Sequence, residues 1–155
     1  MSQHVLITGG AGFIGSHLTR RLLSRGDRIT VYDDFNDYYD PARKRENAAE
    51  FLGHADYTLV EGDIRDAEKV DRLYAEGKFD AVIHLAARAG VRPSLAEPIL
   101  YEDVNCIGTL RLLEAARRHG PKIFLFGSSS SVYGINEKIP FAEDDPVEQP
   151  ISPYA

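Results

Sequence analysis

The sequence predicts an α/β fold, in which a doubly wound parallel sheet carries helices on both faces. Short, fully apolar runs alternate with longer segments of helical periodicity. Strands that are apolar throughout are typical of a parallel sheet covered on both sides. The chain has 155 residues, 43% hydrophobic and 27% charged, which suits a single globular domain with a buried core.

Five runs are predicted to be strands, and each has a glycine or a polar residue at or just after its carboxyl end. They cover residues 5–8, 28–32, 57–60, 81–83 and 123–126. Helices between consecutive strands imply right-handed crossover connections, and these favour the strand order 3-2-1-4-5.

The first three helices follow from apolar spacing and from residues that begin or end helices. After the first strand, apolar residues recur every four positions up to Gly26, which is a helix stop. A polar, tyrosine-rich loop is expected over residues 36–41, and a second helix over residues 42–51. Asp66 is a candidate N-cap for the third helix.

The longest helix is expected over residues 99–119 and ends at Gly120-Pro121. Its apolar positions are interpreted as one stripe, formed by Leu100, Val104, Ile107, Leu110, Leu113 and Ala116. After Gly134, four prolines fall in a polar stretch without periodicity. This composition predicts an irregular loop over the carboxyl ends of the strands.

A glycine-rich loop links the first strand to the first helix. Gly9 allows a sharp turn, Gly12 allows the backbone to approach a pyrophosphate, and Gly15 allows the helix to pack closely. The helix N-terminus supplies unpaired N–H groups and the positive end of the helix dipole. Because the loop lies between a strand and a helix, it predicts a Rossmann-type dinucleotide site.

The acidic residues after the second strand indicate which dinucleotide binds. Asp33 lies close to the offset at which Rossmann-type domains carry a carboxylate for the ribose hydroxyls. That carboxylate repels a 2′-phosphate, so the sequence predicts NAD rather than NADP. Asp34 either shares this role or serves as a turn residue.

Composition excludes several other classes of protein. The net charge of −6 argues against nucleic-acid binding, and the basic runs at residues 43–45 and 117–118 are interpreted as solvated helical faces. No apolar run is long enough to span a membrane. A single cysteine, Cys106, and the lack of a signal peptide favour the cytoplasm. The histidines have no metal-ligand spacing, and His84 is interpreted as a packing residue.

Several motifs together resemble the extended branch of the short-chain dehydrogenase/reductase superfamily, the NAD-dependent nucleotide-sugar epimerases and dehydratases. The motifs are residues 8–15, in which Gly9 and Gly12 lie three positions apart, together with residues 62–64, 84–87, Asn105 and 128–134. Within that branch, residues 34–41 and 89–92 look most like UDP-glucuronate 4-epimerases.

The resemblance implies a complete cofactor site. Asp63 and Ile64 would flank the adenine, and Asn105 would hold backbone or cofactor near the site unless it is a helix-surface amide. The full set of implied cofactor residues is Gly9, Gly12, Phe13, Ile14, Gly15, Asp33, Asp63, Ile64, Leu85, Ala86, Ala87 and Asn105.

The resemblance also implies hydride chemistry on a sugar hydroxyl. In the family, a tyrosine phenolate removes the hydroxyl proton while hydride passes to NAD, and the hydride then returns to the opposite face of the sugar. Tyr154 is similar to the first residue of the Tyr-x-x-x-Lys motif, and Ser129 to the serine that binds the reacting oxygen. The lysine stabilises the phenolate in the family, and this chain ends before it.

Ser130 and Ser131 discriminate between the reactions of this branch. The similar 4,6-dehydratases carry an Asp-Glu pair at these positions, which supplies the acid and base for water elimination. Epimerisation, or simple oxidation or reduction, of a nucleotide sugar therefore remains, and a UDP-sugar is the expected substrate. The alternatives are a non-catalytic NAD-binding module and a related dehydratase or reductase.

Residues 1–155 are interpreted as one incomplete NAD-binding Rossmann domain that ends inside the Tyr-x-x-x-Lys motif and lacks the C-terminal substrate domain. The chain is a fragment of a longer protein, a truncated gene product or a cofactor-binding module, and we expect the isolated chain to be inactive. The resemblance implies a homodimer formed through helices such as residues 99–119, although burial in the core explains their apolar stripe equally well.

Overall fold

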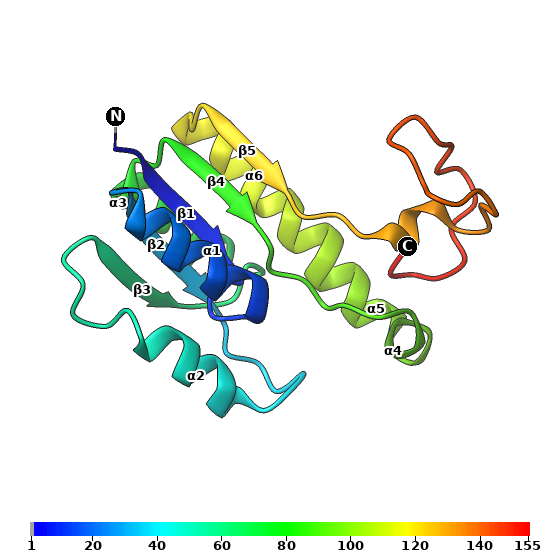
Figure 1. The fold of residues 1–155 in the computed structure, drawn as a ribbon, viewed down its shortest axis with the longest axis horizontal. Helices are drawn as coiled ribbons and strands as arrows, with labels where there is room; N and C mark the ends of the chain where they lie inside the picture. Colours follow the sequence, from blue (N-terminus) through cyan, green and yellow to red (C-terminus); the bar gives the residue numbers. More distant parts are fainter. Residues whose placement is uncertain (1) are drawn as a thin grey trace.

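The computed structural model describes residues 2–155 and contains one five-stranded parallel sheet (Figure 1). The strands are β1 (His4–Thr8), β2 (Arg28–Asp33), β3 (Tyr57–Glu61), β4 (Ala81–His84) and β5 (Ile123–Phe126). Their spatial order is β3-β2-β1-β4-β5, as predicted from the sequence. Each observed strand differs from its predicted bounds by at most one residue at an end.

At least one helix follows each strand. The helices are α1 (Phe13–Ser24), α2 (Pro41–Ala49), α3 (Ala67–Gly77), α4 (Val91–Ala96), α5 (Pro98–Tyr101), η1 (Glu102–Ile107), α6 (Gly108–His119) and η2 (Ser130–Tyr133). The side chain of Asp66 accepts a hydrogen bond from the Lys69 N–H at 3.0 Å, which confirms it as the N-cap of α3. Asp40 caps α2 in the same way, with Pro41 at the first helical position. The sequence analysis did not predict α4 or η2.

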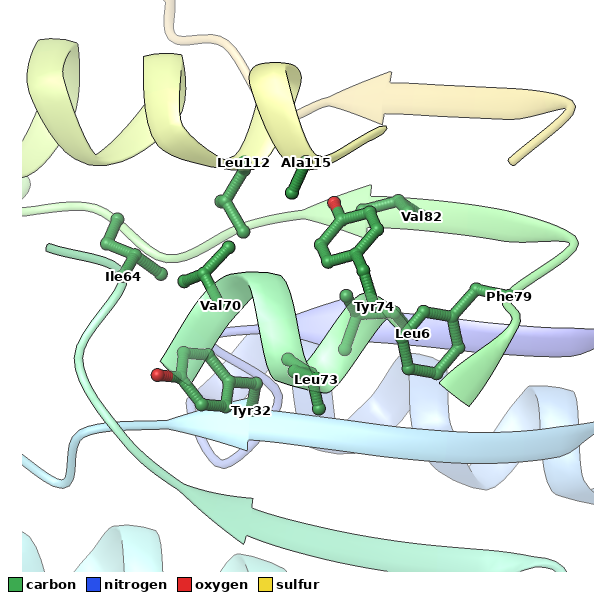
Figure 2. Close-up of a cluster of buried hydrophobic side chains, with 10 residues drawn as sticks. All are labelled: Leu6, Tyr32, Ile64, Val70, Leu73, Tyr74, Phe79, Val82, Leu112 and Ala115. Atoms are coloured by element: carbon green, nitrogen blue, oxygen red, sulfur yellow. The ribbon is translucent and has the colours of Figure 1, made fainter. Parts of the chain in front are cut away.

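The two faces of the sheet carry separate parts of the core, as expected for a doubly wound fold. On one face, α1 and Phe51, in the turn after α2, cover apolar side chains of β1 and β2. On the other face, α3 and α6 pack against the sheet (Figure 2). The residues of this second cluster are Leu6, Tyr32, Ile64, Val70, Leu73, Tyr74, Phe79, Val82, Leu112 and Ala115.

The long helix differs from its prediction in phase. The helical stretch runs from α5 to α6, but η1 in its middle is a π-helical turn. Such a turn holds more residues than an α-helical one, so it rotates the following residues around the axis. Gly108, Leu112 and Ala115 are consequently buried. The predicted stripe is wrong here, because Leu110 and Leu113 are 55% and 42% exposed.

Strand β5 also differs from the expectation that apolar strands are covered on both faces. It lies at the edge of the sheet, and Leu125 and Phe126 are exposed. The chain after β5 extends away from the sheet, shown in orange and red in Figure 1, and after η2 it contains no further helix or strand within the described residues. The lack of regular elements agrees with the prediction for this segment, whereas its expected place over the carboxyl ends of the strands differs from the observed one. Among residues 2–155, none of the helices has both the length and the apolar character needed to cross a membrane.

The structure confirms the interpretation of His84 as a packing residue at the end of β4. It is 2% exposed. The Thr109 hydroxyl donates to the carbonyl of Asn105, so it accepts from His84 Nε2 at 2.9 Å. The Thr8 hydroxyl then donates to Nδ1 at 2.6 Å. This arrangement requires a neutral imidazole, and burial lowers the pKa of His84 from 6.5 to about 4. The chain of hydrogen bonds joins β1, β4 and α6 beside the cleft described below.

We predict that His84 makes the protein less stable in acid. Between pH 6.5 and about 4, the unfolded chain binds a proton at His84 that the folded chain does not bind. The free energy of unfolding therefore falls as the pH falls through this window, by about 3 kcal/mol. Urea denaturation at several pH values will measure the profile. In His84→Gln, the free energy of unfolding should fall by about 3 kcal/mol less over the same pH window. Parallel profiles for the two proteins would contradict the prediction.

Candidate functional site

A cleft of about 470 Å³ lies at the carboxyl ends of the strands. This is the edge of an open parallel sheet at which ligands generally bind, beside the point where the strand order reverses. Loops that follow all five strands contribute to it. The lining residues are Gly9, Gly12, Phe13, Ile14, Gly15, Tyr32, Asp33, Asp34, Asn36, Tyr38, Tyr39, Lys44, Gly62, Asp63, Ile64, Leu85, Ala86, Ala87, Ala89, Val104, Gly127, Ser128 and Tyr154.

The cleft brings together most of the residues that the sequence singled out. All of the predicted cofactor residues except Asn105 line it. Of the two predicted catalytic residues, Tyr154 lines the cleft, whereas Ser129 does not and its neighbour Ser128 does.

The glycine loop is closely packed at two positions. Gly9 has φ +69°, and a Cβ there would lie 2.7 Å from the backbone nitrogen of Ala86. A Cβ on Gly15 would lie 2.5 Å from the Cα of Gly10, so the first turn of α1 packs directly on the loop that precedes it. Only glycine fits these positions without displacing backbone atoms.

The N-terminus of α1 opens onto the cleft. Its N-cap residue, Gly12, provides no side chain that caps the helix. A Cβ on Gly12 would lie 3.2 Å from the Gly9 carbonyl oxygen and 3.4 Å from the Tyr39 hydroxyl, so a methyl group would be tightly packed here. The first-turn N–H groups and the helix dipole therefore face space that an anion can occupy.

Asp33 joins the floor of the cleft to two other segments. One carboxylate oxygen accepts the Ala11 N–H at 3.1 Å, and the other accepts the Phe35 N–H at 3.0 Å. Lys44 Nζ lies 3.6 Å from the second oxygen. Burial raises the pKa of Asp33, while the N–H donors and the ammonium group act in the opposite direction.

Lys44 corrects the interpretation of residues 43–45 as a solvated basic run. It is 6% exposed, and besides Asp33 it lies 5.2 Å from the centre of the Tyr39 ring. The available signal was its helical spacing with Ala48 and Phe51, both of which are buried. Asp34 accepts the Asn36 N–H at 3.0 Å, which is the turn role that was left open for it.

The loop after β3 is held by an ion-pair network. Arg65 donates to both carboxylate oxygens of Asp63, and its Nη1 lies 3.1 Å from Asp103 at the start of η1. Burial alone would raise the pKa of Asp63, but the hydrogen bonds from Arg65 outweigh it and hold the pKa below its ordinary value. The network fixes Asp63 and Ile64 at the edge of the cleft.

Asn105 holds the loop after β4 through the backbone. Its Oδ1 accepts the Arg88 N–H at 2.8 Å, and its Nδ2 donates to the Arg88 carbonyl at 2.9 Å. The alternative of a helix-surface amide is therefore wrong. This loop carries Leu85, Ala86 and Ala87, so Asn105 positions lining residues without lining the cleft itself.

The two candidate catalytic residues lie in different local settings. The ring of Tyr154 packs edge-on against Tyr101, with ring centres 6.3 Å apart. The side chain of Ser129 caps η2 by accepting the Ser131 N–H at 3.2 Å. Among the described residues, no hydrogen bond joins Ser129 to Tyr154. Tyr38, Tyr39 and Val104 also line the cleft and were not predicted to do so. The only signal for the two tyrosines was the tyrosine content of residues 36–41, and for Val104 it was its place in a predicted helix.

Comparison with known proteins identifies a family and several relatives to which this chain is similar. The family model for GDP-mannose 4,6 dehydratase matches residues 6–155. UDP-glucuronate 4-epimerase 4 of Arabidopsis thaliana is 45% identical over 152 residues, which make up 97% of this chain and 35% of that protein. The chain thus spans about a third of the length of this curated relative.

Solved structures give the same picture at the level of the fold. The UDP-Glc/GlcNAc 4-epimerase of Campylobacter jejuni matches with a TM-score of 0.86 and 32% identity, over 99% of this chain and 45% of that one. The UDP-glucose 4-epimerase of Thermus thermophilus, solved with NAD, matches with a TM-score of 0.83 and 38% identity, over 97% and 46% of the two chains.

We predict different effects for two neighbouring carboxylates. Asp33→Asn leaves Lys44 without its nearest buried partner and turns an amide towards the Ala11 N–H, so it should lower the free energy of unfolding by about 2–3 kcal/mol. Asp34→Asn is the matched control, and because Asp34 is partly exposed, the loss should stay below about 1 kcal/mol. Equal losses of unfolding free energy, measured by urea denaturation, would contradict the prediction that the buried Asp33–Lys44 pair contributes more to stability than Asp34 does.

Proposed function

Because the chain belongs to the GDP-mannose 4,6-dehydratase family, we propose that it is the NAD-binding part of a nucleotide-sugar epimerase similar to the UDP-glucuronate 4-epimerases. The family membership confirms the resemblance to the extended short-chain dehydrogenases/reductases. One observation carries the proposal: a single cleft is lined by the glycine loop, by Asp33 and by Tyr154. Residues 1–155 are then one NAD-binding domain of the Rossmann type, incomplete by comparison with its longer relatives.

The shape and chemistry of the cleft suit NAD. The uncapped N-terminus of α1, and the lack of a side chain on Gly12 where it lines the cleft, suit the diphosphate. Each carboxylate oxygen of Asp33 accepts one backbone N–H and retains a lone pair for a ribose hydroxyl. A 2′-phosphate would meet that buried carboxylate, which favours NAD over NADP. Asp63 and Ile64, beyond β3, are proposed to flank the adenine, and residues 85–87 to line the rest.

The chain's own residues would act on the sugar hydroxyl. When bound, NAD accepts a hydride from the sugar carbon and later returns it. We assign Tyr154 Oη to remove the proton from the hydroxyl and to give it back after the sugar has turned over. Ser129 would bind the reacting oxygen once its hydroxyl turns from Ser131 to the cleft. Asn105 would act through the backbone of Arg88 and not on the cofactor directly.

Epimerisation is favoured over dehydration by two side chains. Ser130 and Ser131 begin η2, where the acid and base of a dehydratase would be needed, and a hydroxyl supplies neither at neutral pH. A non-catalytic NAD-binding module shares the same cleft, and so does a related reductase. A lysine codon four positions after that of Tyr154 in the coding sequence would exclude the module.

We further propose a UDP-sugar as the substrate, the cytoplasm as the location and a homodimer as the assembly. The named substrate of the plant relative supports the UDP-sugar. The single cysteine supports a reducing compartment. The exposed Leu110 and Leu113 on α6 support an interface along this helix.

We predict that the chain binds NAD and binds NADP at least about tenfold more weakly, because of Asp33. Gly12→Ala should abolish NAD binding and lower the thermal stability only slightly, because the Gly9 carbonyl oxygen must shift by a few tenths of an ångström to admit the methyl group, which then occupies the proposed diphosphate position. Arg21→Ala, at an exposed position in the last turn of the same helix, is the control. Isothermal titration calorimetry measures the affinities. Undiminished binding by Gly12→Ala would overturn the assigned diphosphate position.

We predict that this chain alone does not convert UDP-glucuronate. Within these 155 residues, no lysine follows Tyr154 to stabilise its phenolate. Chromatography of the nucleotide sugars after incubation with NAD should recover UDP-glucuronate unchanged, and the same should hold for UDP-glucose and dTDP-glucose. Formation of a 4-epimer would contradict this account of the base, and formation of a 4-keto-6-deoxy sugar would favour a dehydratase.

A further inference from the structure

One hydrogen bond crosses the cofactor cleft. Residues 34–40, which we name the strap, follow β2, and Ala89 lies in the loop after β4. Because β1 lies between β2 and β4 in the sheet, the glycine loop that follows β1 separates these two segments (Figure 1). The Tyr38 hydroxyl nevertheless donates to the Ala89 carbonyl at 2.6 Å. Both residues line the cleft, so this bond links its opposite walls.

Apart from Arg88, whose guanidinium carbon lies 5.9 Å from the centre of the Tyr38 ring, the strap is held on its own side of the cleft, by the buried side chain of Phe35 and by local turns. Asn36 N–H donates to Asp34 at 3.0 Å, and Tyr38 N–H donates to Asn36 Oδ1 at 3.1 Å. Asp40 caps α2, where the strap ends. Within residues 2–155, the Tyr38 hydroxyl makes the only hydrogen bond that ties the strap to the far wall. Tyr38 is 41% exposed, so water can compete for this bond.

The far wall has anchors of its own besides the bond from the strap. Asn105 holds both backbone groups of Arg88. The Tyr101 hydroxyl donates to the same Ala89 carbonyl at 2.6 Å, and Tyr101 is buried. Burial raises the pKa of Tyr101 to about 12, so its hydroxyl remains a donor throughout the neutral range. If the bond from Tyr38 breaks, the strap moves and the loop after β4 stays in place.

The strap lies over the part of the cleft that suits the diphosphate. The hydroxyl of Tyr39, the next residue, lies 3.4 Å from the position of a Cβ on Gly12. A dinucleotide that extends from Asp33 past Gly12 to Tyr154 must therefore pass beneath the segment that Tyr38 latches. Its entry and exit require the Tyr38 bond to open.

We propose that Tyr38 is a positioning residue that latches the strap across the cleft and thereby sets the rates at which the dinucleotide enters and leaves. This inference rests on the proposed NAD binding. The latch joins two parts of the protein and forms without ligand. Its loss should consequently speed association and dissociation together and leave the equilibrium affinity nearly unchanged, whereas loss of a direct contact with the ligand would speed dissociation alone.

The test compares two tyrosines that donate to the same carbonyl. Stopped-flow measurements of NADH fluorescence give the association and dissociation rate constants of the wild-type chain, Tyr38→Phe and Tyr101→Phe. Tyr38→Phe should raise both constants about tenfold, the effect of one lost hydrogen bond, and change Kd by less than about threefold. Tyr101→Phe should leave both within about twofold, because it removes the same group from the same acceptor without opening the cleft.

The outcomes separate this inference from the proposed function. If the wild-type chain does not bind NADH, the proposed function fails and the latch fails with it. If the chain binds NADH and Tyr38→Phe has unchanged rate constants, only the latch is overturned. A rise in the dissociation rate constant alone would likewise overturn the latch and leave NAD binding intact. Equal effects of the two substitutions on the rate constants would do the same.

Discussion

The carboxylate of Asp33 joins three segments that are separate in the sequence. It accepts N–H groups from the glycine loop at Ala11 and from its own turn at Phe35, and it pairs with Lys44 on α2. These contacts bring the glycine loop, the end of β2 and the following helix to one place. A charge in this position is buried, so it needs all of these partners. The same constraint leaves the carboxylate at the floor of the cleft, where a ribose can reach it.

The order of the parallel strands places the loops that line the cleft beside Asp33. Because β1 is central, the loops after β2 and β4 stand on either side of the glycine loop. The Thr8, His84 and Thr109 side chains link β1, β4 and α6 beneath them. Above the cleft, the loops are linked again through Tyr38 and Ala89. The proposed binding of the cofactor and the proposed control of its access therefore rest on different residues around one cleft.

The π-helical turn η1 breaks the regular helical period on which the sequence prediction depends. A regular helical period places Leu110 and Leu113 on the core side, but the turn shifts the phase and buries Leu112 and Ala115 instead. The same turn contains Asn105, whose amide holds both backbone groups of Arg88. An irregular turn that carries a positioning side chain is common at functional sites. No spacing rule applied to residues 99–119 reveals it.

The sequence by itself determined the strand order, the glycine loop and the acid at the end of β2, because each depends on local periodicity or on a residue type at a fixed offset from a strand. Only the tertiary structure decided that Lys44 is buried beside Asp33, that Ser129 faces its own turn, and that Tyr38 reaches Ala89. These features are contacts between segments distant in the chain or choices among hydrogen-bond partners. Their outcome depends on which surfaces the folded sheet brings together, and no local pattern encodes that.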